Sequence, residues 1–372
     1  MASPIEKLPA SPWAGSYHHR DDARVRIYAF YGAGGTAAMF EIWQKLLAKQ
    51  FPEIEFCGVE WPGRGKHKGD FISDPKLWLA AIREQILKPA MKEWFKCPFV
   101  FLGQSTGARL AYDLVRELSK DKILPGKVYV VARSPPVVPD LKWVDEAPED
   151  SLEYLNWISE ELLESQAEKL KTLWPRLPKE DLEQRVALFR ADLELNAAPL
   201  EPLAPTEWKV VAPGGKLVKK NVPMSDRMIQ IVRDQGSTLH TTGQEFTGPT
   251  GGKWVQLDPE YGEKNKGWLL VHGKTVGVDH QLLDVVAESV PEGDSEFWQA
   301  PVPFQIHVSD KDRIQPWKDP TGRLRPTEEW VKLTKEVPEY VKYEGMLHDA
   351  FLMDPSVITN ICNDIIKLFN LR

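Results

Sequence analysis

The sequence predicts an α/β protein whose central sheet is mostly parallel and carries helices on both faces. Short, almost wholly apolar segments alternate with amphipathic segments of helical periodicity as far as about residue 135. The same alternation resumes at about residue 302 and continues to the C-terminus. Continuous apolar strands separated by helices are typical of a sheet that is buried on both faces.

Each element of this alternation follows from its pattern. Apolar runs predict strands, and apolar side chains at helical spacing predict helices. Between 24 and 136 the expected strands are 24–30, 54–60, 98–102 and 127–132, and the expected helices are 37–50, 75–94 and 106–119. Beyond 300 they are a strand at 302–308, a helix at 326–336, a strand at 340–343 and a helix at 355–369.

Two long segments interrupt the α/β pattern. Residues 137–205 have helical periodicity, include Trp143, Trp157 and Trp174, and predict a helical lid. Residues 206–300 predict an inserted β-rich module, a small antiparallel barrel or sandwich, from strand patterns at 245–257 and 267–273 between Gly-rich turns. The core would then be 24–136 with 301–372, and 1–23 an irregular N-terminal extension.

Composition excludes several classes of protein. The net charge of −7, from 47 basic and 54 acidic side chains, argues against nonspecific nucleic-acid binding. Three widely spaced cysteines indicate a reducing compartment and exclude a disulfide scaffold or zinc ribbon. The N-terminus lacks a secretory h-region, and no apolar run approaches the roughly 18 residues of a membrane span. We therefore expect a soluble cytoplasmic protein without a membrane span, and leave organelle import open.

One serine lies in a sequence motif whose residue types have a chemical explanation. Gly103-Gln-Ser-Thr-Gly107 matches G-x-S-x-G, follows an apolar strand and precedes an amphipathic helix. In that context the serine sits on a sharp, strained turn, and the flanking glycines let strand and helix approach closely. The segment predicts the nucleophile turn of an α/β-hydrolase fold, with Ser105 as nucleophile. The alternative is an ordinary turn with a solvated serine.

A serine nucleophile requires a base, which follows it in the chain order of this fold. Of eight histidines, three precede Ser105 and three lie in the β insertion. His307 lies inside a predicted strand, where it would need no further role. His348 follows the last predicted strand, where a loop would bring it to the edge of the sheet that carries the serine. It is the expected base, with a surface-loop histidine as the alternative.

The acid and the oxyanion donors are less sharply defined. Asp310 and Asp312 both follow the strand at 302–308, and either could be an ordinary turn aspartate. The backbone N–H groups of Thr106, after the nucleophile, and Ala33, in the glycine turn after the first strand, are the expected oxyanion donors. That turn lacks the third glycine of a dinucleotide motif, and neither a cofactor nor a metal site is predicted.

Together these segments resemble one known family, the type II (editing) thioesterases of polyketide and nonribosomal peptide synthesis. The similar stretches are 30–40, 58–65, 98–114, 188–195, 308–312 and 345–352. The resemblance implies hydrolysis of an acyl thioester on the phosphopantetheine arm of an acyl carrier protein or a polyketide or fatty-acid synthase module. It also implies a triad of Ser105, Asp312 and His348, because Ser309 stands where the family has the glycine three places before its acid.

The sequence departs from the family in a few places. Gln104 and Thr106 stand where His and Met are usual, and Asp349 and Ala350 where aromatic residues are frequent. Residues 206–300 have no counterpart in a typical member of the family, and their pattern weakly resembles an SH3-type barrel. This insertion is either a module that docks a partner or an inert surface excursion. Three alternatives stay open: coenzyme A thioesters as substrates, an ester hydrolase or acyltransferase with the same triad, and a non-catalytic scaffold.

Overall fold

The computed structural model describes residues 4–87, 94–136, 146–197, 200, 207–221, 227–247, 252–258, 261, 266–286, 297–315, 317 and 327–371. The chain divides into two compact units, Met1–Leu200 with Gln299–Arg372, and Glu201–Trp298. Each unit has its own sheet.

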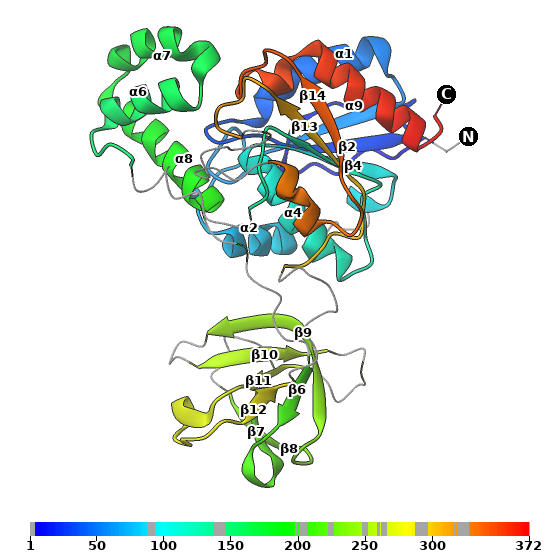
Figure 1. Ribbon diagram of the computed structural model, residues 1–372, viewed down its shortest axis with the longest axis vertical. Coiled ribbons are helices and arrows are strands. Elements are labelled where there is room, and N and C mark those ends of the chain that lie inside the picture. Colours follow the sequence, from blue (N-terminus) through cyan, green and yellow to red (C-terminus); the bar gives the residue numbers. More distant parts are fainter. Residues whose placement is uncertain are drawn as a thin grey trace. The chain divides into compact units, whose positions relative to one another are not determined.

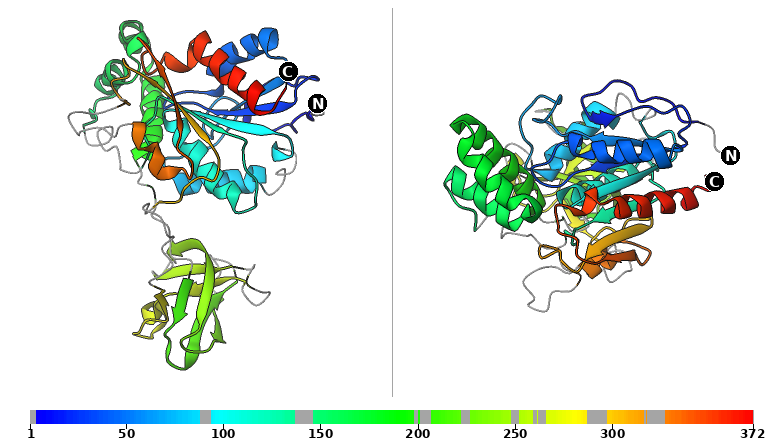
Figure 2. Two further views of the ribbon diagram at one scale, coloured as in Figure 1. Left: turned by 45° about the vertical axis from the view of Figure 1, so that its right-hand side comes forward. Right: turned by 90° about the horizontal axis from the view of Figure 1, so that it is seen from above.

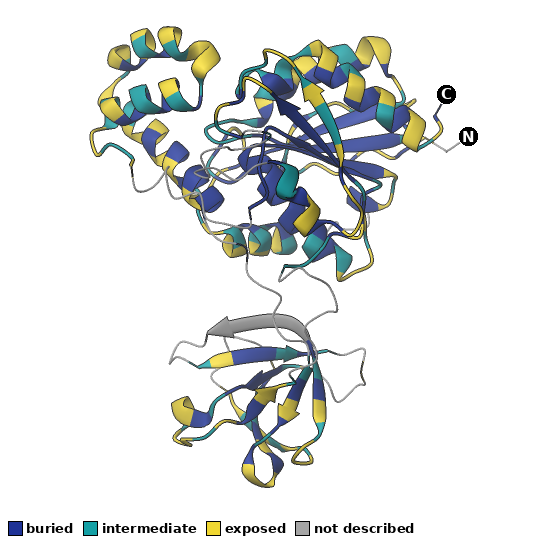
Figure 3. Cartoon of the chain, in the orientation of Figure 1, coloured by how far each residue is buried: buried dark blue, intermediate teal, exposed yellow. Residues whose placement is uncertain are grey.

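The first unit is built on a seven-stranded sheet (Figure 1). In spatial order its strands are β1 (Ala14–Tyr17), β3 (Ile54–Val59), β2 (Val25–Phe30), β4 (Phe99–Gln104), β5 (Val128–Val131), β13 (Phe304–Ser309) and β14 (Glu339–Tyr343). Only β1 runs antiparallel to its neighbour. The strands from β3 to β13 are buried along their whole length (Figure 3), as continuous apolar runs predict.

Helices cover both faces of this sheet, so the predicted α/β architecture is confirmed. Helices α1 and α9 lie on one face, and α2 and α4 on the other (Figures 1 and 2). Two of these helices begin with an aspartate cap followed by proline, which supplies an acceptor for a free N–H and a preset φ. The helical segments are η1 (Ala37–Phe40), α1 (Glu41–Gln50), α2 (Pro75–Ile82), η2 (Arg83–Leu87), α4 (Thr106–Ser119), η8 (Thr327–Leu333), η9 (Phe351–Met353) and α9 (Pro355–Leu368).

Three sequence-based expectations for this unit need correction. Residues 1–23 are not all irregular, because Ala14–Tyr17 pairs with β3 and extends the sheet; four residues with little apolar character gave no strand signal. The helix expected at 75–94 ends at Ile82 and continues as a π-helical turn, and 88–93 lie outside the described residues. The segment at 327–333 is a 3-10 helix, held by the buried Trp330, whose indole N–H donates to the carbonyl of Arg133.

The predicted lid is mostly helical in its described part. Its segments are α6 (Ser151–Glu161), η3 (Glu164–Gln166), α7 (Ala167–Leu173), η4 (Trp174–Arg176) and α8 (Lys179–Ala197). They share a small apolar core around Tyr154, Ile158 and Phe189, against which Ala33 and Ile314 of the α/β core also pack. Trp143 lies outside the described residues.

The second unit is an antiparallel sheet, as the insertion pattern predicts. Its spatial order is β12 (Leu283–Val285), β6 (Glu207–Val210), β9 (Thr238–Thr247), β10 (Lys253–Leu257), β11 (Trp268–Leu270), β7 (Lys216–Lys220) and β8 (Ile229–Val232). Short 3-10 turns occur at η5 (Pro213–Gly215) and η7 (Gly273–Val276). Trp208, Trp254 and Trp268 are buried together in one cluster, so these three tryptophans belong to the core of the unit.

The described residues contain neither a membrane-spanning helix nor a cluster of metal ligands. None of its helices combines the length and apolar character that crossing a membrane requires. No group of three or more His, Cys, Asp or Glu side chains in the described ranges is placed to hold a metal ion.

Candidate active site

Ser105 occupies a strained turn between β4 and α4. Its φ of 48° and ψ of −120° place a non-glycine residue in a region that L-amino acids rarely adopt. A Cβ at Gly107 would lie 2.2 Å from the carbonyl oxygen of Phe30, and one at Gly103 would lie 2.4 Å from Cα of Ala108. Glycine is therefore required on both sides of the serine, as the G-x-S-x-G pattern predicts.

The structure brings His348 and Asp312 together. His348 follows β14, Asp312 follows β13, and Nδ1 of His348 lies 3.2 and 3.1 Å from the two carboxylate oxygens. Oδ1 of Asp312 also accepts the backbone N–H groups of Ile314 and Gln315, at 3.0 and 2.9 Å. The carboxylate is fully buried, so these donors and the imidazole fix its orientation.

Asp310, the other candidate acid, has a different contact. Its Oδ1 accepts the backbone N–H of Gly345 at 2.7 Å, three residues before His348. Asp310 therefore shapes the loop that carries the histidine, whereas Asp312 contacts the imidazole itself. The geometry separates two aspartates that spacing alone leaves equivalent.

Nε2 of His348 takes no part in the contact with Asp312, which is made by Nδ1. It is buried and has no hydrogen-bond partner among the described residues. His348 and Ser105 line the same pocket, although the described part of the chain holds no hydrogen bond between them. Hydrogen bonds between a serine and its base are often long before substrate binds.

The glycine turn after β2 lies against the serine. A Cβ at Gly32 would be 3.3 Å from Cβ of Ser105, and Gly35 N–H closes the turn onto the carbonyl of Gly32 at 3.2 Å. Ala33 is part of the pocket wall. Thr106 is the first residue of α4, whose N-terminal amides favour negative charge. Thr106 thus follows the serine directly, and Ala33 lines the same pocket as Ser105.

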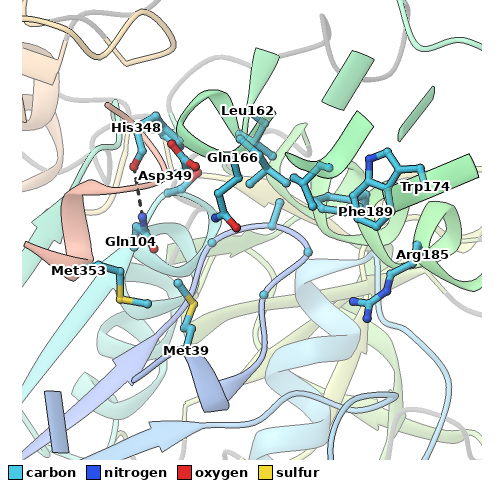
Figure 4. Close-up of a pocket in the computed structure, with 17 residues that line it drawn as sticks. Met39, Gln104, Leu162, Gln166, Trp174, Arg185, Phe189, His348, Asp349 and Met353 are labelled. Carbon is cyan, nitrogen blue, oxygen red and sulfur yellow. Dashed lines mark hydrogen bonds between the residues drawn. The ribbon is translucent and has the colours of Figure 1, made fainter. Parts of the chain in front are cut away.

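The pocket has a volume of about 320 Å³ and is lined by Ser105 and His348. It extends from His348 along the lid (Figure 4). His348 and Gln104 lie at one end, and Trp174, Phe189 and Arg185 at the other. Most of the wall is apolar, which suits an acyl chain. The lid supplies Leu162, Leu163, Leu170, Trp174 and Phe189, and the α/β core supplies Met39 and Met353.

His307 is a core histidine, as the sequence indicates. Its Nδ1 lies 3.0 Å from the hydroxyl of Tyr343, and its Nε2 lies 2.9 Å from Oε1 of Gln305. Burial lowers the pKa of His307 to about 3, so the ring is neutral at physiological pH. Both nitrogens are used within the strands, which leaves none for a substrate.

The structure adds a role for Gln104 that sequence reasoning missed. Its Nε2 donates to the backbone carbonyl of His348 at 3.3 Å (Figure 4). The side chain is buried and also lines the pocket. Nothing in the sequence signals this contact, which joins residues 244 positions apart.

We expect Gln104→Leu to lower kcat about tenfold, because the loop that carries His348 loses one of its anchors. The matched control is Gln44→Leu, since Gln44 is also buried and donates to the carbonyls of Ser16 and Phe56, away from the pocket. Steady-state kinetics at equal folded fraction compare the two variants. Equal kcat values would contradict the anchoring role.

Asp349, which lies in the loop after β14, contacts the lid. Its carboxylate accepts the backbone N–H and the hydroxyl of Ser165, which lies in η3 of the lid. The lid is thus joined to the loop that follows β14, beside His348.

A buried ion pair lies behind the glycine turn. Arg64 donates to Oδ1 of Asp192 on α8, and Oδ2 of Asp192 accepts the backbone N–H of Gly34 at 2.7 Å. Both charged side chains are almost completely buried. The guanidinium also lies over the ring of Trp61, 4.5 Å from its centroid. The sequence places Arg64 and Asp192 in separate motifs and gives no sign that they meet.

Burial raises the pKa of Asp192 from 3.8 to about 6, and Arg64 and the Gly34 N–H counteract only part of this rise. Among the described residues, Tyr154 interacts electrostatically with Asp192, and the hydroxyl of Tyr31 lies 3.5 Å from Nη1 of Arg64. A carboxyl with a higher pKa in the folded chain than in the unfolded chain binds the proton more tightly when folded. The contribution of Asp192 to the free energy of unfolding therefore falls as the pH rises from about 4 to about 6.

This titration predicts a pH-dependent difference between the wild type and Asp192→Asn. The wild type should lose on the order of 3 kcal/mol relative to the variant between pH 4 and pH 7, from the pKa rise and about 1.4 kcal/mol per unit. Denaturant unfolding of both proteins across this range measures the difference. A difference that grows in favour of the wild type with pH would mean that the folded-state pKa lies below 3.8.

The sheet topology and the strained serine turn, followed along the chain by an aspartate after β13 and a histidine after β14, define an α/β-hydrolase fold. The sequence profile of the thioesterase domain family matches residues 25–214, just over half of the 372-residue chain. The chain belongs to this family, which confirms the resemblance noted from its motifs.

Individual relatives agree with that assignment. Gramicidin S biosynthesis protein GrsT of Aneurinibacillus migulanus is 31% identical over 171 residues, which are 44% of this chain and 64% of GrsT. A probable cadicidin biosynthesis thioesterase of Streptomyces griseus is 29% identical over 128 residues, 34% of this chain and 33% of that protein. The chain thus spans less than two thirds of the length of these relatives.

Solved structures agree on the fold. RedJ, a thioesterase from the prodiginine pathway of Streptomyces coelicolor, has a TM-score of 0.50 at 16% identity, covering 98% of this chain and 90% of RedJ. BorB, a type II thioesterase from the borrelidin cluster, has a TM-score of 0.50 at 13% identity, covering 96% of this chain and 99% of BorB.

Proposed function

We propose that this protein hydrolyses acyl thioesters on the phosphopantetheine arm of carrier proteins through Ser105, Asp312 and His348. The observation that carries the proposal is one pocket, in a member of the thioesterase family, lined by a strained serine and by a histidine that contacts a buried aspartate. GrsT is a gramicidin S biosynthesis protein and BorB is a type II thioesterase from the borrelidin biosynthetic cluster, which supports a carrier-bound substrate.

The first half of the reaction forms an acyl-enzyme. Nε2 of His348 takes the proton of the Ser105 hydroxyl while Oγ attacks the thioester carbonyl. The backbone N–H groups of Ala33 and Thr106 stabilise the oxyanion of the tetrahedral intermediate. Asp312 holds the imidazole in the tautomer that leaves Nε2 free and stabilises the imidazolium. The C–S bond breaks, and the thiol leaves with the proton from His348.

The second half regenerates the serine. A water molecule gives its proton to His348 and attacks the acyl ester on Ser105, and the carbon–oxygen bond to the serine breaks. The carboxylic acid leaves, and Oγ recovers the proton from His348. During both steps the apolar wall of the pocket holds the acyl chain away from bulk water.

The domain organisation is part of this proposal. We assign 24–136 with 301–372 to the hydrolase core, 137–205 to the lid and 206–300 to an inserted module. The division of the chain into compact units at Leu200 and Gln299 supports these boundaries.

The test is a substrate panel in which only the linkage or the carrier changes. Acyl groups of one length are offered as carrier-protein, coenzyme A and free pantetheine thioesters, and as the matched oxygen esters. We expect the highest kcat/KM on the carrier-protein thioester and loss of turnover in Ser105→Ala. Turnover of oxygen esters alone would contradict the substrate class, and equal rates on coenzyme A would remove the preference for carrier proteins.

A further inference from the structure

The carboxylate of Asp192 connects the lid helix α8 to the turn that supplies one oxyanion donor. Oδ2 accepts the Gly34 N–H at 2.7 Å, and Oδ1 is engaged by Arg64. The side chain is fully buried, so water does not compete for either oxygen. Each oxygen thus has one defined partner, and the carboxylate has one orientation.

The contact falls on the peptide unit that follows Ala33. The N–H of Gly34 belongs to that peptide unit, so holding it restricts the rotation of Ala33 about its Cα–C bond. Gly34 itself has a φ of 72°, a left-handed conformation that glycine adopts without strain. Because glycine has no Cβ, its backbone can also rotate out of this conformation at little cost. A turn of this kind needs an external partner to keep its donor groups aligned.

Arg64 keeps that partner in place. Its guanidinium lies over Trp61, and its Nη1 is 3.5 Å from the hydroxyl of Tyr31, the residue that precedes the glycine turn. Tyr31 and Trp61 stack with ring centroids 4.4 Å apart. Arg64 thus contacts Tyr31, at the start of the glycine turn that Asp192 holds through Gly34. The turn is therefore restrained at both ends.

The helix α8 makes a second contact with the turn. A Cβ on Gly34 would lie 2.0 Å from the ring of Phe189, one helical turn before Asp192. Phe189 also lines the acyl pocket. The face of α8 that closes the pocket is therefore the face that carries Asp192.

Stability alone does not account for the pair. Burial raises the pKa of Asp192 to about 6 even beside Arg64, so the ionised carboxylate costs folding free energy at neutral pH. Buried ion pairs are often no better for stability than apolar side chains of the same volume. What the pair supplies is a fixed geometry at the glycine turn.

We propose that Asp192, held by Arg64, is a positioning residue that aligns the Ala33 N–H for the oxyanion of the reaction. The inference rests on the proposed function, because it gives the turn an electrostatic role in catalysis. Misalignment of one donor in an oxyanion site lowers kcat by a large factor and changes substrate binding little, since the donor acts mainly in the transition state.

The test compares variants of the full-length chain at equal folded fraction. Asp192→Ala removes the acceptor of the Gly34 N–H and should lower kcat about 30- to 100-fold, with KM within about threefold of the wild type. The double variant Arg64→Met with Asp192→Asn keeps an oxygen for Gly34 without leaving a buried charge unpaired. We expect it to recover kcat to within about tenfold of the wild type, which a purely structural role does not predict.

Glu55→Gln is the matched control. Glu55 is fully buried and paired with Arg26 at 2.6 Å, away from the pocket. We expect this variant to lose stability but to keep its kcat once the folded fraction is accounted for. Amide hydrogen exchange of residues 32–35 gives a readout that does not depend on activity, and it should be faster in Asp192→Ala than in Glu55→Gln.

The outcomes separate this inference from the proposed function. Ser105-dependent turnover that Asp192→Ala leaves within twofold of the wild type would overturn the positioning role alone. The role would also fail if Glu55→Gln lowered kcat as much as Asp192→Ala, or if the double variant recovered nothing. Turnover that does not depend on Ser105 would overturn the proposed function, and the positioning role with it. If Asp192→Ala does not fold, the kcat of the double variant and the amide hydrogen exchange of its residues 32–35 provide the same test.

Discussion

Replacing Ser105 with alanine is expected to lower kcat for thioester hydrolysis about 10⁵- to 10⁶-fold, because the acyl-enzyme can no longer form. The residual rate would come from the oxyanion donors and the binding pocket, which the substitution leaves in place. We expect the fold to be unchanged, because the substitution removes only one hydroxyl. The strained φ of 48° at this position is imposed by the junction of β4 and α4 and not by the serine side chain. Single-turnover kinetics with an acyl-pantetheine substrate measure the loss.

Ser119→Ala is the matched control for this prediction. Ser119 ends the same helix that begins after Ser105, and its hydroxyl donates to the carbonyl of Arg116 at 2.8 Å. We expect full activity in this variant. A Ser105→Ala protein that keeps more than about one per cent of the wild-type rate would exclude Ser105 as the nucleophile.

Asp312→Asn is expected to lower kcat about 10⁴-fold through the tautomer of His348. Oδ1 of Asp312 accepts two backbone N–H groups, so the oxygen of the new amide should occupy that position. The amide NH₂ then takes the place of Oδ2, 3.1 Å from Nδ1 of His348, and donates to it. The imidazole proton moves to Nε2, which can no longer accept the proton of Ser105.

Asp310→Asn provides the comparison. Asp310 accepts the Gly345 N–H through Oδ1, and an amide oxygen can still do so. We expect this variant to stay within about tenfold of the wild type. Equal losses in the two variants, measured as kcat over a range of pH, would contradict the assignment of Asp312 as the acid.

The parts of the site that local sequence determines could be predicted. Ser105 lies on a turn whose glycines and flanking strand and helix are adjacent in the chain, so its strained geometry follows from five residues and their context. The order of Asp312 and His348 follows from the order of the strands they terminate. The choice between Asp310 and Asp312 depends on how one loop closes, and within the sequence only the family resemblance distinguishes them.

The parts that depend on distant segments could not be predicted. The contact between Asp192 and Gly34 joins residues 158 positions apart, and no periodicity or spacing encodes it. Gln104 reaches His348 across the site in the same way. The edge strand β1 could not be predicted, because its four residues of mixed polarity show no alternating pattern. The strand is stabilised by its pairing with β3, which is distant in the sequence.

The most direct measurement is the mass of the covalent intermediate. Wild-type protein is mixed with an acyl-pantetheine thioester, quenched in acid within one turnover, digested and analysed by peptide mass spectrometry. We predict one added acyl group on the peptide that contains Ser105, and no such adduct in Ser105→Ala. An acyl group on a different residue, or turnover that proceeds with Ser105 never acylated, would contradict the account.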